Sequence, residues 1–109
     1  MNTRNFFAAA ALGVCALFLN ACGSTASLAP PVTPALVKAA SGEKADAATL
    51  TAGRSIFVSR CIQCHALQDV SRFNGPRLTA IVGMMSRRAN LSPTQHDALL
   101  KYLQTVRSL

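Results

Sequence analysis

The chain has 109 residues, a formal net charge of +7 and a pI of about 10.1, and 50% of its residues are hydrophobic. This length leaves room for one domain. Such a positive charge would suit a nucleic-acid-binding protein, but the N-terminal segment points to export and argues against that class.

Residues 1–21 have the pattern of a signal peptide. Arg4 and the amino terminus precede an unbroken run of fourteen apolar or glycine residues, 6–19, which includes Cys15. The run is too short for a comfortable membrane-spanning helix and suits the apolar core of a signal peptide. We therefore leave this segment out of the fold prediction.

The end of this segment, Leu19-Asn20-Ala21-Cys22, resembles a bacterial lipobox. The resemblance implies cleavage before Cys22 and attachment of lipid to its thiol. Several acyl chains on one cysteine would hold the protein stably on the periplasmic side of a membrane. The alternative is ordinary cleavage, at Ala21 or after Ala29, which would give a soluble periplasmic protein.

Residues 22–48 are rich in Ser, Thr, Ala and Pro and contain few large apolar side chains, with three prolines between 30 and 34. This composition predicts a flexible, semi-extended tether between the membrane and a folded domain at 49–109. A short helix at 35–40 is compatible with the composition, and the sequence indicates no function for it.

The domain begins with a predicted amphipathic helix over 49–60. Leu50, Gly53, Phe57 and Cys61 recur there at helical spacing. A glycine inside a helix costs about 1 kcal/mol relative to alanine, which suggests that a close packing partner requires it.

Two further helices are predicted after a polar loop at 68–76. The first has one apolar face, made by positions 78, 81, 82, 85 and 89. The second begins with a capping box at Ser92 and Gln95, with a proline at its first position. Its buried stripe consists of Leu99, Leu103 and Val106, with Tyr102 beside it. No alternating strand pattern appears after residue 49, so we predict an all-α fold with three main helices.

A Cys-Ile-Gln-Cys-His sequence follows the first of these helices, with its cysteines at Cys61 and Cys64 and its histidine at His65. This spacing is the attachment signature of c-type haem. Residues three apart on a helical turn lie on nearly the same side, so both thiols can reach the two vinyl groups of one porphyrin. The adjacent histidine can present Nε2 to the iron as proximal ligand. A covalent haem c would also staple a small domain in which no cysteine pair remains for a disulfide.

Two other chemistries of a Cys-x-x-Cys motif fit the sequence less well. A thioredoxin-like dithiol belongs at a strand-to-helix junction, and no strand is predicted here. A structural zinc site needs four ligands, and the available set is poor: Cys61, Cys64, His65 and the distant His96.

Over about residues 50–109 the chain resembles the class I cytochromes c, small electron carriers with one haem. In that family a helical glycine and an aromatic residue precede the first haem cysteine at intervals of four, as Gly53 and Phe57 do here. The family's last helix has a pattern matched by Leu99, Tyr102 and Leu103. The stretch before that helix is much shorter here than in larger members. The resemblance therefore implies a minimal cytochrome c fold around one haem c.

The family also has a Gly-Pro-x-Leu segment after the haem motif, matched here by residues 75–78. Its proline carbonyl accepts the Nδ1–H of the proximal histidine. The resemblance thus implies that Pro76 orients His65 and fixes its tautomer.

The sixth iron ligand is expected to be a methionine, since the family usually places one shortly before the last helix and a thioether raises the reduction potential. Met84 and Met85 stand side by side. Spacing to the last helix favours Met84, whereas the apolar face favours Met85, which we prefer. The alternative is that both are core methionines and the site is bis-histidine or open. His96, the only other histidine, is expected to be solvated in the first turn of the capped helix.

The sequence therefore predicts a membrane-tethered, periplasmic mono-haem cytochrome c that carries single electrons and is not itself an enzyme. From residue 50 onward there are eight basic and two acidic residues. This excess suits docking on the acidic surface of a redox partner, through an attraction that salt weakens, and contact with anionic lipid is its competing use. No nucleic acid and no small-molecule substrate is expected. The alternatives are a haem c sensor with an open or exchangeable sixth ligand, or an accessory subunit of a larger oxidoreductase complex.

Overall fold

The computed structural model describes residues 23–109, and every regular element in that range is helical. The long helices are α4 (Ala47–Ser59), α5 (Gly75–Arg88) and α6 (Pro93–Arg107). The shorter elements are α2 (Gly23–Leu28), α3 (Pro34–Ala39) and the 3-10 turns η2 (Ala40–Glu43), η3 (Cys61–Gln63) and η4 (Val70–Arg72). The prediction of an all-α fold is confirmed for this part of the chain.

Side-chain caps fix where the long helices begin. An aspartate caps α4, and the predicted capping box between Ser92 and Gln95 is present at α6. At α5 the Asn74 side chain accepts a hydrogen bond of 2.9 Å from the Arg77 N–H. Pro76 therefore lies in the first turn of α5 rather than at the end of the predicted loop.

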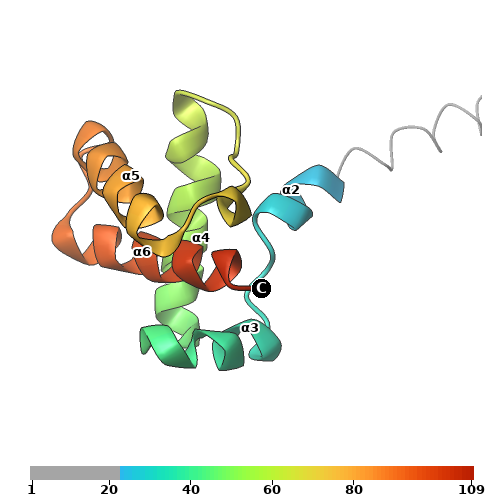
Figure 1. Cartoon of the computed structure of the whole chain (residues 1–109). Helices are drawn as coiled ribbons and strands as arrows, with labels where there is room; N and C mark the ends of the chain where they lie inside the picture. The colour runs from blue at the N-terminus through green and yellow to red at the C-terminus, as the bar shows by residue number, and fades with distance from the viewer. Residues whose placement is uncertain (1–22) are drawn as a thin grey trace, which may run out of the picture.

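The centre of the fold is the crossing of α4 and α6, beside which α5 packs on α6 (Figure 1). The two helices meet at Gly53, where a Cβ atom would overlap the Ala98 carbonyl and would lie 2.7 Å from the Tyr102 Cβ. Leu50 and Tyr102 are fully buried beside this contact. The close packing partner predicted for the helical glycine is thus the backbone of α6.

The segment before α4 differs from the predicted tether, because residues 29–45 pack against the long helices. Ala29 and Ala40 have no exposed surface and Leu36 is 4% exposed. The Tyr102 hydroxyl donates a hydrogen bond of 2.8 Å to the Pro30 carbonyl, and Arg54 Nε lies 3.1 Å from the carbonyl of Ala29 and 3.2 Å from that of Pro30. The packed domain therefore begins before residue 49. Much of the buried surface of this segment belongs to small alanine side chains. A sequence analysis that looks for large apolar residues does not detect packing of this kind.

Tyr102→Phe is expected to lower the free energy of unfolding by about 1 kcal/mol at neutral pH, because it removes the bond to Pro30. Burial raises the pKa of Tyr102 from 10.0 to about 12. The stability contributed by the neutral hydroxyl is therefore complete below pH 10.0 and is lost as the pH rises to about 12. Chemical unfolding across this range should show a steeper loss for the parent than for the variant. Equal losses would contradict the buried hydroxyl.

Between residues 23 and 109 no helix is long and apolar enough to cross a membrane. The predicted signal peptide, with Cys15, and the predicted lipidation site Cys22 lie outside the described residues.

Candidate functional site

The Cys-x-x-Cys-His motif lies directly after α4, where the chain tightens into the single turn η3. Cys61 is half-buried at the start of this turn, and burial raises the pKa of its thiol. Cys64 and His65 are exposed, and both thiols are free. Both thiols thus lie on one tight turn at the end of a single helix. Two thioether bonds to one planar group require this kind of placement.

Two adjoining cavities lie against this turn. The inner cavity, of about 390 Å³, is bounded by side chains of α4, α5, α6 and the loop between α4 and α5. The outer cavity, of about 420 Å³, lies on the side of Cys64 and the end of α5. Both volumes fall in the range of cofactor pockets, about 300–1,000 Å³. The residues that line both are Cys61, His65, Met85 and Leu99.

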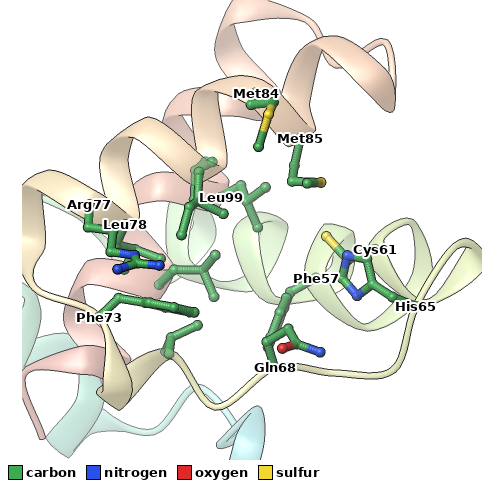
Figure 2. A pocket seen from close by; sticks show the side chains of 14 residues that line it. Phe57, Cys61, His65, Gln68, Phe73, Arg77, Leu78, Met84, Met85 and Leu99 are labelled. Carbon is green, nitrogen blue, oxygen red and sulfur yellow. The ribbon is translucent and has the colours of Figure 1, made fainter.

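The α5 wall of the inner cavity is the predicted apolar face of that helix. Leu78 and Val82 are buried, while Ile81 and Met85 are partly exposed, and all four line the cavity. Figure 2 shows the two methionines on one side of the cavity and Cys61 with His65 on another. The apolar face predicted for this helix therefore forms one wall of the cavity.

The two methionines differ in placement. Met85 lines both cavities, whereas Met84 lines the inner one alone and is 38% exposed. Met85 is therefore the methionine on the boundary shared with Cys61 and His65.

The contact between Pro76 and His65 implied by the family resemblance is not formed. His65 Nδ1 instead lies 2.8 Å from the carbonyl of the next residue, Ala66. The physical reason is the Asn74 cap, which places Pro76 inside the first turn of α5, where backbone carbonyls point along the helix. Pro76 lines neither cavity.

His96 also differs from its prediction, since it is partly buried rather than fully solvated. Its Nδ1 lies 2.8 Å from the hydroxyl of Ser86 on α5. The sequence held a signal for this burial, because His96 stands three residues before Leu99 and so shares the buried face of α6. Ser86, which is 5% exposed, was not singled out by sequence reasoning.

Positive charge surrounds the site. Arg77 lines the inner cavity, with its guanidinium 5.6 Å from the centre of the Phe73 ring. Arg60 and Arg88 line the outer cavity. No acidic side chain lines either cavity within residues 23–109.

The alternative uses of the two cysteines find little support in this geometry. His96 lines neither cavity, and no group of three or more His, Cys, Asp or Glu side chains in the described part of the chain is arranged to hold a metal ion. The motif follows a helix, whereas a thioredoxin-like dithiol belongs at a strand-to-helix junction.

Searches of protein-family models, curated proteins and solved structures gave no match to this chain.

Proposed function

We propose that the protein is a one-electron carrier of the cytochrome c kind, with one haem c held covalently by Cys61 and Cys64. The observation that carries the proposal is the position of the Cys-x-x-Cys-His turn. It opens onto paired cavities whose far wall is an apolar helix face bearing a methionine. A histidine and a thioether facing a largely apolar space are the donor set that haem iron takes in electron carriers.

Each side chain has a role in this proposal. Cys61 and Cys64 hold the porphyrin edge by thioether bonds, and His65 is the proximal ligand. The apolar side chains of Leu78, Val82 and Leu99, all buried, exclude water from the faces of the ring. A haem bound here would supply a one-electron cycle between Fe(II) and Fe(III).

Met85 is the preferred distal ligand. It borders both cavities together with His65, whereas Met84 is more exposed and borders the inner one alone. His65 and Met85 thus bracket the boundary between the cavities, where an iron bound by both would lie.

The basic surface supports an electron carrier that docks on partners. The arginines at the cavity mouths have no acidic neighbour among the lining residues of the described chain, so they favour an acidic partner surface, with an association that salt slows. Attachment to the periplasmic side of a membrane through Cys22 is part of the same proposal.

The decisive measurement is a visible and far-red absorption spectrum of protein expressed with haem c maturation enzymes, beside Met84→Ala and Met85→Ala variants. We expect covalent haem in all three proteins. The weak far-red band that reports sulfur–iron bonding should be lost in Met85→Ala and kept in Met84→Ala, because only Met85 borders both cavities.

Loss of that band in Met84→Ala alone would exchange the two methionines. Covalent haem without the band in the parent would favour the haem c sensor or an accessory subunit with an open sixth site. Absence of covalent haem from the parent would refute the proposal and return both cysteines to thiol chemistry.

A further inference from the structure

The last turn of α5 and the bend after it have a closely defined shape. The Leu91 N–H donates a hydrogen bond of 2.9 Å to the Ser86 carbonyl, and the Asn90 N–H donates one of 3.2 Å to the Arg87 carbonyl. Asn90 itself has a left-handed backbone, with φ of 53°. These features make a Schellman closure, which ties off the helix end that carries Met85.

The side chain of Arg60, the residue directly after α4, contacts this bend. The Arg60 guanidinium donates a hydrogen bond of 2.6 Å from Nη2 to the carbonyl of Ala89. Arg60 is the C-cap residue of α4 and directly precedes Cys61. The bond therefore joins the side of the outer cavity that carries the cysteines to the side that carries Met85.

The side chain of His96 on α6 contacts the same helix end one turn earlier. His96 Nδ1 and the Ser86 hydroxyl are 2.8 Å apart. Ser86 directly follows Met85 and is buried. Two contacts with other elements therefore follow Met85 closely, one at the next residue, Ser86, and one four residues on, at Ala89.

We propose that Arg60 and His96 are positioning residues that hold Met85 opposite the Cys61–His65 turn. The inference rests on the proposed function. Arg60 acts through the Ala89 carbonyl and His96 through Ser86. A thioether is a neutral ligand that a small external base can displace from the iron. If the helix end that carries Met85 is already fixed, less conformational entropy is lost when the thioether binds, and binding of Met85 is favoured.

The test is displacement of Met85 by imidazole in the oxidised, haem-loaded protein, followed by the loss of the far-red band. Arg60→Ala and His96→Ala are each expected to bind imidazole about tenfold more tightly than the parent, the typical effect of one part-buried hydrogen bond. Arg60→Lys keeps a donor and should fall between Arg60→Ala and the parent. The double variant His96→Ala/Ser86→Ala should bind imidazole no more tightly than either single variant, because both substitutions remove the same hydrogen bond.

Two matched controls separate positioning from general loss of stability. Arg87→Ala removes the same charge from the same helix end, and Arg87 lines neither cavity and forms no side-chain hydrogen bond or ion pair with any residue of 23–109. Gln104→Ala loosens α6 from the opposite end of α5, where Gln104 Nε2 donates 3.0 Å to the Gly75 carbonyl. Both controls should bind imidazole as the parent does.

Equal imidazole affinity in the parent, Arg60→Ala and His96→Ala would overturn the inference while leaving the carrier proposal intact. An equal rise in Gln104→Ala would also overturn it, since the effect would then follow stability alone. A parent without covalent haem would overturn both proposals together.

Discussion

Replacing Gly53 by alanine is expected to destabilise the protein by about 3 kcal/mol or more, at the upper end of what overpacking costs. The same substitution in an exposed helix interior stabilises by up to about 1 kcal/mol. The sign reverses here because the new methyl group would overlap the Ala98 carbonyl and press on the Tyr102 Cβ. A backbone carbonyl cannot rotate away as a flexible side chain can, so α4 and α6 must separate.

Gly83→Ala is the matched control, because Gly83 is also inside a long helix. A Cβ there would meet only the end of the Arg87 side chain, at 3.9 Å. Chemical unfolding of the parent and both variants checks the prediction. Gly83→Ala should equal or exceed the parent in the free energy of unfolding. If Gly53→Ala matched Gly83→Ala, α4 and α6 could not be in close contact at Gly53.

Local signals in the sequence predicted the helices well. The capping box at Ser92 and Gln95 places the start of α6, and the 3.6-residue period of the apolar positions places the cavity wall of α5. Gly53 could be tied to a helix contact because an interior glycine is costly without one. Each of these inferences depends on residues within a few positions of one another.

Features that depend on distant partners were missed. The segment around Pro30 is held by Tyr102 and Arg54, and His96 is held by Ser86. No pattern near Pro30 in the sequence predicts that its carbonyl accepts a hydrogen bond from a tyrosine hydroxyl seventy-two positions away. The predicted bond from His65 to Pro76 failed for a related reason, since the Asn74 cap starts α5 early and local helix geometry overrides the family pattern.

Replacing Cys61 and Cys64 together by alanine is expected to abolish covalent haem attachment and to loosen α5 selectively. α4 and α5 each pack against α6, but they face one another across the inner cavity, with Phe57 on one side and Val82 on the other. Without a group joining these walls, α5 depends on its contact with α6 and on the hydrogen bond from Arg60 to the Ala89 carbonyl at its end. Local opening of such an element needs less free energy than global unfolding.

Amide hydrogen exchange in the double variant should therefore become about tenfold or more faster in α5, which corresponds to roughly 1.4 kcal/mol of local stability, while α4 and α6 change less. Ile62→Ala is the control, because Ile62 lies between the two cysteines, is 50% exposed and leaves both thiols in place. It should keep covalent haem and the exchange pattern of the parent. Unchanged protection of α5 in a haem-free double variant would mean that the contacts with α6 and Arg60 are enough to secure this helix. A haem bound in the cavity would then contribute nothing measurable to the local stability of α5.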